Sequence, residues 1–598
     1  MVLAKKPPLL LTAGAALLLI GVGALAYWGL SRRGTLTRNL PVGIRAVPTD
    51  AVMAFSLSTS EEEWRRLRQF GTPETQAQFD QFLAKWRDRI LTDNSLNFST
   101  DIKPWIGPEV TVAILPDSQA VNTPSEPTPL PLPEDTANAL VLLPIADPAK
   151  AQSTLGDRIQ KSQAGASQDY KGITIQQVEG AEGTPLYAAV LGTEFVVVGN
   201  QLATVEQSID AFKGGKSLVD VPGFNKAFEQ LKSDNAFSHF YVNVPSAIQT
   251  LADNAQPALS PSTLETFKAP RGLAGALNLE AKGIQLQSIS WLHSGTSQSF
   301  SQQNGPDQLT QRVPANALLF VSGGNFQQFW QDLKEQHSLA TILPIDTENV
   351  AVSLQAATGL TPEEDLLPWM KGEFALGILA PPQTNSSPDG TTVPNPALVL
   401  MVKASDRKAA GDAFARLDEV MKTRYRFAVK TEELGGAPVT RWTSPFEGLN
   451  LSHGWLEGDV AFLTLGTGVE TAIAPRPKQS LAQDNLFQLT TGQAPRPNNG
   501  HFFVDLKDLS ASQNNLLLPP LPENGIVTSK AIEAIGVTAT VLGERQVRYD
   551  LFVALPRGNR PGALPQASQD EPTNPSSTPG SSPSSTPQSS PSPSPTAE

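Results

Sequence analysis

The chain has 598 residues, a formal net charge of −13 and no cysteine. The lack of cysteine excludes disulfides, zinc–thiolate and iron–sulfur sites and thiol catalysis. Because phosphate binding needs a basic face, an acidic chain with scattered Lys and Arg is a poor candidate for a nucleic-acid partner. A hydrophobic content of 40% also excludes a fully disordered chain.

The first predicted element is an apolar helix near the N-terminus. Residues 9–30 run for 22 positions without a charge, and as a helix they span about 33 Å, enough to cross a bilayer core. The length favours an uncleaved signal anchor; the alternative is a signal peptide cleaved after Ala26. We therefore expect residues 1–39 to be a membrane anchor with its flank. The bulk of the chain then lies outside the cytoplasm, on the periplasmic or thylakoid-lumen side.

Four sequence blocks recur in the same order about 260 residues apart. They begin at Ala46 and Arg312, Lys103 and Leu367, Ala139 and Ala397, and His239 and His501. Repetition at a nearly constant spacing indicates a tandem duplication. We expect a first repeat over 40–300, a second over 301–557 and a tail over 558–598.

Within each repeat, apolar runs bounded by turn residues predict strands. The expected strands are 51–57, 109–115, 138–143, 173–178, 186–191, 195–198, 272–279 and 284–292 in the first repeat, 317–322, 373–379, 397–402, 438–442, 451–456 and 460–465 in the second, and one beginning at each of His239 and His501. Ser60 and Thr361 are expected to cap helices, and further helices are expected near Asp147 and Asp406. Short turns between strands imply antiparallel pairing.

The predicted fold class is therefore α+β. It comprises two tandem duplicated halves of about 260 residues, each an antiparallel sheet with packed helices, after one N-terminal transmembrane helix. Residues 558–598 are rich in Pro and Ser and cannot bury a core, so we expect a disordered tail. This tail is either a spacer that threads the cell wall or a solvated end without a role.

The repeated blocks resemble a known family. The resemblance rests on the signal anchor, on Val-Pro-x-x-Ala before a strand (Val47 and Val313), on the Pro-Trp blocks that end in Glu, and on Ser-Leu pairs at Ser217 and Ser480. Together these features are similar to domain-of-unknown-function family 3352, over roughly residues 40–557. The resemblance implies a membrane-anchored extracytoplasmic bacterial protein, largely of cyanobacterial type. It implies no catalytic residues, because the family has no assigned activity.

Two short segments resemble catalytic or phosphate-binding motifs, but each lacks a residue that the motif requires. The segment from Gly214 to Ser217 ends like a phosphate-binding loop, yet Asp210 stands where the earlier Gly is required, so we expect a helix-ending turn. Ser405 and Lys408 form a Ser-x-x-Lys, but no Lys-Thr-Gly accompanies it. We predict no catalytic residue, no cofactor and no metal site.

Six residues in equivalent positions remain as candidates for structure or binding: Trp105, Trp369, Glu109, Glu373, His239 and His501. The tryptophans are exposed anchors for a partner or glycan, or indoles packed under the sheet. The glutamates form a symmetric carboxylate pair across the halves, or solvated strand starts. The histidines are ligand or pH-sensing sites, or bond locally at strand ends.

These observations favour a non-catalytic binding or scaffolding module with an unknown protein or lipid partner, held to the membrane by residues 9–30. The alternatives are a carrier or chaperone of a lipid or apolar ligand and an envelope hydrolase. An apolar surface patch would favour the scaffold, a deep apolar cavity the carrier, and clustered polar groups in a cleft the enzyme.

Overall fold

The computed structural model describes residues 40–565 in part. The described ranges exclude 89–96, 117–137, 162–165, 180–184, 232–235, 255–268, 297–298, 301–304, 306, 335–346, 381–396, 446–449, 467 and 512–530. The predicted membrane helix at 9–30 and the tail beyond residue 565 lie outside the described residues. Among the helices that are described, none has the length and apolar character needed to span a bilayer.

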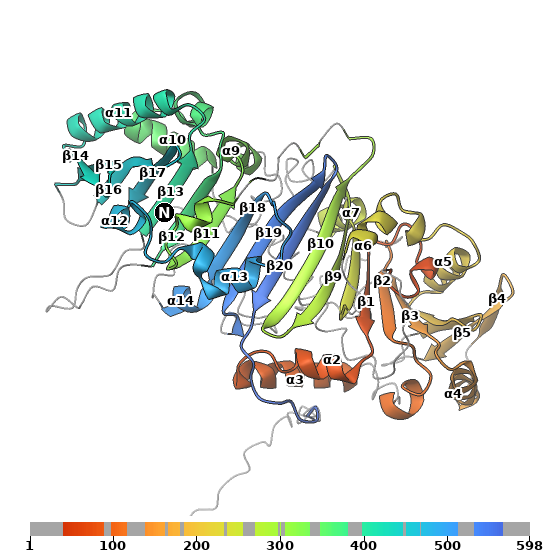
Figure 1. Ribbon diagram of the computed structural model, residues 1–598. Helices are drawn as coiled ribbons and strands as arrows, with labels where there is room; N and C mark the ends of the chain where they lie inside the picture. Colours follow the sequence, from red (N-terminus) through yellow and green to blue (C-terminus); the bar gives the residue numbers. More distant parts are fainter. Residues whose placement is uncertain are drawn as a thin grey trace, which may run out of the picture.

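Among the described residues, the core is one sheet of twenty strands, and every pairing in it is antiparallel (Figure 1). From one edge the order is β4 (Ser167–Tyr170), β5 (Ile173–Glu179), β6 (Pro185–Leu191), β7 (Phe195–Gly199), β3 (Ala139–Pro144), β2 (Glu109–Ile114), β1 (Met53–Ser58), β8 (Ser238–Asn243), β9 (Pro270–Glu280) and β10 (Gly283–Leu292). It continues with β20 (Gln546–Ala554), β19 (Ala534–Gly543), β18 (Gly500–Asp505), β11 (Ala317–Gly323), β12 (Phe374–Leu379), β13 (Ala397–Lys403), β17 (Val460–Leu465), β16 (Asn450–Leu456), β15 (Ala437–Thr443) and β14 (Ala428–Leu434).

This arrangement confirms the α+β class, and the predicted strand ranges agree with the observed ones to within two residues at each end. The expectation of a separate sheet in each half is wrong. β10 pairs with β20 from Gly283 opposite Ala554 to Trp291 opposite Gln546, so the sheet runs unbroken through both halves. Strand order on one side of this central pair mirrors the order on the other.

Helices cover both faces of the sheet. On face A, defined by Ala54, Tyr241 and Ile289, apolar side chains pack against α5 (Leu202–Phe212) and α6 (Phe224–Gln230). Face A continues in the second half under α12 (Val469–Ile473) and α13 (Asn485–Thr491).

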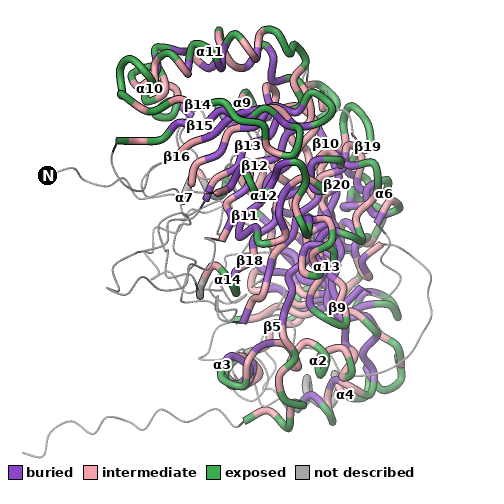
Figure 2. Tube along the Cα trace, turned by 60° about the vertical axis from the view of Figure 1, so that its left-hand side comes forward, coloured by how far each residue is buried: buried purple, intermediate pink, exposed green. Residues whose placement is uncertain are grey.

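Face B lies opposite, because successive side chains in a strand point to alternate sides. It packs against α2 (Glu61–Leu67) and α4 (Pro148–Lys161) in the first half, and against α9 (Phe326–Lys334) and α11 (Arg407–Thr423) in the second. The remaining described α-helices are α3 (Pro73–Arg87), α7 (Val244–Asn254), α10 (Thr347–Thr358) and α14 (Leu506–Ala511). Buried residues concentrate in the sheet, and exposed ones on the outer helices (Figure 2).

The two predicted helix caps behave differently. The Ser60 side chain accepts a hydrogen bond from the Glu63 amide and starts α2, as expected. Thr361 caps no α-helix: it precedes a π-helical turn over Pro362–Leu366, and its side chain accepts no capping hydrogen bond. Instead, the Asp365 carboxylate accepts from both the amide and the hydroxyl of Thr361, at 2.8 and 3.5 Å.

The chain after β20 crosses back to the first half and forms a strap against α3. Two backbone bonds attach it: Gly71 donates to the Pro556 carbonyl, and Gly558 donates to the Gln69 carbonyl, each at 2.8 Å. The buried Gln76 side chain adds two bonds, accepting from the Asn559 amide at 3.0 Å and donating to the Asn559 carbonyl at 3.1 Å. The strap therefore ties the C-terminal end of the second half to the first.

We expect Gln76→Ala to lower the free energy of unfolding by about 1–3 kcal/mol, because it leaves two backbone groups of the strap without their partner. Urea unfolding of the purified protein measures this. Gln78→Ala, on an exposed position of the same helix, is the matched control and should change the free energy of unfolding by less than about 0.5 kcal/mol. Equal effects of the two substitutions would contradict the role given to the strap.

Candidate functional site

The two repeated tryptophans lie under face B in equivalent settings. Trp105 is 3% exposed and Trp369 is 4% exposed. Each indole N–H donates to a backbone carbonyl four residues earlier, Asp101 at 2.6 Å and Asp365 at 3.2 Å. These carbonyls belong to π-helical turns over Phe98–Ile102 and Pro362–Leu366. Both side chains therefore pack as structural indoles, and neither presents a ring to a glycan or partner.

The first glutamate and histidine come together on face A. Glu109 begins β2 and His239 lies in β8, on either side of β1. A Glu109 Oε1 atom is 3.4 Å from His239 Nδ1, and the Ser56 hydroxyl of β1 lies 3.4 Å from the same nitrogen. The His239 Nε2 atom is buried, and no described residue bonds to it. The expectation of local bonding at a strand end is wrong, because the partners come from distant parts of the chain.

The second pair is built differently. Glu373 accepts hydrogen bonds from the Gln308 and Leu309 amides at 2.6 and 2.8 Å. His501 does not bond to it but holds Asp307 at 2.9 Å through Nε2 and Thr538 at 2.8 Å through Nδ1. Both repeats thus place a carboxylate against a buried histidine, with Asp307 in the role that Glu109 has in the first half. Nothing in the repeated blocks predicted Asp307.

The environments move the two glutamate pKa values in opposite directions. Burial alone would raise the pKa of Glu109, but the hydrogen bond and charge of His239, with help from Ser56 and the Val42 amide, hold it below its ordinary value. For Glu373, burial dominates over the amide hydrogen bonds, and the nearby Asp307 adds to it, so the pKa is raised. Neither glutamate is a solvated strand start, which corrects that expectation.

The structure does not join the halves in one carboxylate site. β2 and β12, which carry or follow the glutamates, are nine strand positions apart in the sheet. At about 4.8 Å per strand this separation is on the order of 40 Å. The two glutamate–histidine neighbourhoods therefore do not form a single carboxylate site.

A buried row of side chains connects the two neighbourhoods across face A. Cross-strand register places directly opposite one another, in order, Ser56, His239, Ala276, Gln287, Asp550, Thr538 and His501. All seven are buried. At its centre Arg548 forms a two-pronged ion pair with Asp550 at 2.7 and 2.8 Å. Sequence reasoning missed this row, although Arg548 and Asp550 at alternate positions of an apolar strand were a signal for it.

The residues of the two rejected motifs have structural partners. The Ser405 hydroxyl donates to the Trp369 carbonyl at 3.0 Å, and the Lys408 ammonium pairs with Asp412 at 2.8 Å. Gly214 has a positive φ of 97°, and the Gly215 amide returns to the Asp210 carbonyl at 2.9 Å just beyond the end of α5. That geometry is a helix-ending turn, as expected.

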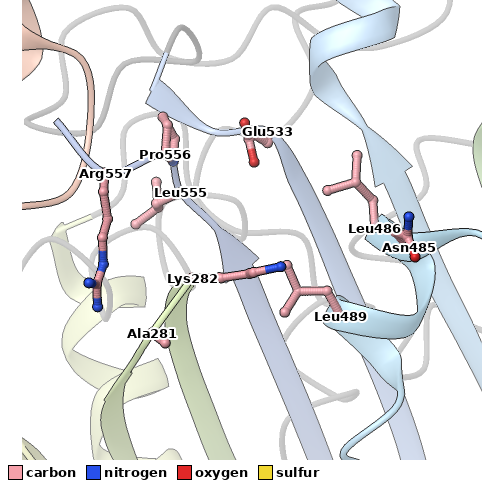
Figure 3. A pocket seen from close by; sticks show the side chains of 9 residues that line it. All are labelled: Ala281, Lys282, Asn485, Leu486, Leu489, Glu533, Leu555, Pro556 and Arg557. Atoms are coloured by element: carbon pink, nitrogen blue, oxygen red, sulfur yellow. The ribbon is translucent and has the colours of Figure 1, made fainter.

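A cavity of about 340 Å³ opens at one end of the central strand pair (Figure 3). Its lining comes from the β9–β10 turn, from α13 and from the chain around the ends of β19 and β20: Ala281, Lys282, Asn485, Leu486, Leu489, Glu533, Leu555, Pro556 and Arg557. None of the six predicted site residues contributes to it. Among the described residues, no group of three or more His, Asp or Glu side chains is arranged to hold a metal ion.

Comparisons with known proteins identify a family and little else. The profile described as "Protein of unknown function (DUF3352)" matches residues 11–555. No curated protein matches the chain. Among solved structures, crystal forms III and I of TP0453 align with 12% and 11% identity. They cover 42% and 44% of this chain and 80% and 81% of TP0453, with TM-scores of 0.23 and 0.24. Likeness at that level supports no inference about this fold.

The opposite pKa directions of the glutamates make a matched test. We expect Glu109→Gln to lower the free energy of unfolding at pH 7 by about 1–3 kcal/mol, because the ionised carboxylate is the form that the fold stabilises. With a folded pKa below the ordinary 4.5, that contribution is present above pH 4.5 and is lost as the pH falls through the folded value. The difference between wild type and variant should therefore shrink in acid.

Glu373→Gln should be neutral or stabilising at pH 7, since the amide oxygen still accepts from Gln308 and Leu309 and the buried charge is gone. Its raised pKa means that wild-type stability falls as the pH rises from 4.5 through the folded value. Urea unfolding of both variants at pH 7 and pH 4 measures these effects. Equal destabilisation by the two substitutions at pH 7 would contradict the assignment.

Proposed function

The chain belongs to the DUF3352 family of proteins of unknown function, and we propose that it is a membrane-anchored binding or scaffolding module without a catalytic centre. In this proposal residues 9–30 hold the protein in the membrane as a single-pass anchor. The sheet and its helices lie on the extracytoplasmic side, and the tail adds reach.

The module is proposed to be a tandem duplication. Support comes from the mirrored strand order about β10 and β20. The same local devices also recur at equivalent places: a π-helical turn with its tryptophan, and a histidine whose neighbouring strand offers Ser56 in one half and Ser322 in the other. Duplication gives one rigid frame two related sets of surface elements.

The observation that carries the binding proposal is the exposure of α10. Of its twelve residues only the terminal Thr347 and Thr358 are buried. Val352 is 64% exposed and Val350 is 43% exposed, and no charged residue follows Glu348 in the helix. A solvated helix is normally polar on its outer sides, so a helix with a single charged residue and exposed valines fits a partner-binding element.

The position of α10 suits a protein partner. It lies in the outer part of the second half beside α11 (Figure 1), where the Tyr425 hydroxyl, just beyond the end of α11, donates to the Ala357 carbonyl at 2.9 Å. Tyr425 is itself 36% exposed. We propose a protein partner with a complementary apolar patch, because such burial is the main source of association energy.

The alternatives receive less support from the described residues. A carrier of whole lipids needs a deep apolar cavity, whereas the cavity at the central strands holds about 340 Å³ and is lined by charged as well as apolar groups. A hydrolase needs a reactive group in a cleft, whereas His239, His453 and His501 are buried and each lies against a carboxylate.

We expect Val350→Glu with Val352→Glu to reduce recovery of a recurrent partner at least tenfold. The measurement is cross-linking of tagged full-length protein in intact cells, followed by quantitative mass spectrometry of proteins and lipids. Val190→Glu, at a valine of similar exposure (44%) on β6, is the matched control and should leave recovery unchanged. Recovery of a near-stoichiometric lipid without a protein partner, or equal loss in the control, would overturn the proposal.

A further inference from the structure

The cavity at the central strand pair has a chemical character that goes beyond the scaffold proposal and does not depend on it. Leu486, Leu489 and Leu555 give it an apolar wall, and Lys282 and Arg557 bring two cations. Figure 3 shows the Lys282 side chain extending toward Leu489 of α13, with Arg557 beside the hairpin turn at Ala281. Both side chains are exposed, and within the described part of the chain neither cation has an ion-pair partner or a side-chain hydrogen bond.

At the opposite end of the same strand pair, a cation in the equivalent turn has hydrogen-bond partners from the protein itself. Lys282 in the β9–β10 turn corresponds to Arg545 in the β19–β20 turn, because Leu555 donates to the Lys282 carbonyl at 3.1 Å as Leu292 donates to the Arg545 carbonyl at 3.0 Å. The Arg545 guanidinium, however, donates to the carbonyls of His293 and Thr296 at 2.9 and 3.3 Å.

At the β19–β20 turn, backbone carbonyl oxygens of the protein therefore accept the hydrogen bonds of the cation. At the other end, the chain after Leu555 leaves along α3 as the strap, since Gly71 and Gly558 bond there. Lys282 thus presents N–H donors beside an apolar wall, in a space that the described part of the chain leaves unfilled.

The net charge of the groups that line the cavity restricts the charge of the ligand. Glu533 lines the same cavity, so its three charged groups sum to one positive charge. A singly charged anion neutralises that set, whereas a dianion leaves an excess negative charge in a partly apolar site. The volume of about 340 Å³ is at the small end of ligand pockets.

We propose that this cavity binds a small amphiphile with a single negative charge, its anionic group held by Lys282 and its apolar body against Leu486, Leu489 and Leu555, while Arg557 adds positive charge at the edge of the cavity. Two sources supply that chemistry: a free monocarboxylate, or the headgroup region of a lipid with one negative charge. Each makes the same contacts in the cavity, and the experiment separates them.

The test uses full-length protein in nanodiscs of zwitterionic lipid, with hexanoate as the probe and empty nanodiscs as the blank. Calorimetry should give saturable binding with a Kd of about 1 mM or tighter. Hexanol and hexyl phosphate should bind at least tenfold more weakly. The double variant Lys282→Gln, Arg557→Gln should lose at least tenfold in affinity, and the exposed control Lys216→Gln less than twofold.

A second variant keeps the test independent of any effect on folding: Leu489→Ala retains both cations and should weaken hexanoate binding at least threefold. In nanodiscs containing phosphatidylglycerol, a lowered apparent affinity for hexanoate in the wild type alone identifies the lipid as a competing occupant; an unchanged affinity identifies the free anion. Hexanoate that binds no tighter than hexanol, or equally to wild type and double variant, would overturn the proposal. Neither result bears on α10, so the scaffold proposal stands or falls separately.

Discussion

The pairing of β10 with β20 is the interaction on which the rest of the structure depends. Each of these strands is the innermost of its own half, and the two meet along nine residue pairs from Gly283–Ala554 to Trp291–Gln546. Without this pairing, each half would expose a long row of backbone N–H and C=O groups, which is an aggregation hazard. The strap that returns from β20 to α3 adds a second tie between the halves.

The buried polar row explains how the central pairing keeps its register. A slip of one strand by one residue would turn its face A side chains, Gln287 of β10 or Asp550 of β20, toward the apolar side chains of face B. Arg548 and Asp550 lie on the same strand and would move together, so the cost comes from burying polar and charged groups in an apolar layer, and the row acts mainly by penalising wrong registers. The histidines near the ends of the row, with Glu109 and Asp307, extend the same constraint into each half.

Much of the fold followed from the sequence because strand signals are local. Apolar runs such as 195–198 and 460–465 can be recognised as strands from the adjacent residues alone, and the structure shows them as β7 and β17. β4 and β14 were missed because their residues are mostly polar and exposed, as edge strands tend to be. β19 and β20 were missed because Thr538, Arg548 and Asp550 interrupt the apolar face, and only the cross-strand register explains why polar residues are buried there. For the same reason the sequence placed Glu109, Glu373, His239 and His501 in equivalent positions but could not predict their partners, which come from other strands.

The most direct test of a continuous sheet is hydrogen–deuterium exchange of the full-length protein, read by mass spectrometry on peptides that cover 283–292 and 546–554. If the two halves share one sheet, these amides should exchange as slowly as those of β1 and β11, because all of them open only in a large unfolding event. The result that would contradict the account is exchange as fast as that of the edge strands β4 and β14 while β1 and β11 stay protected, since it would mean that the halves are separate bodies.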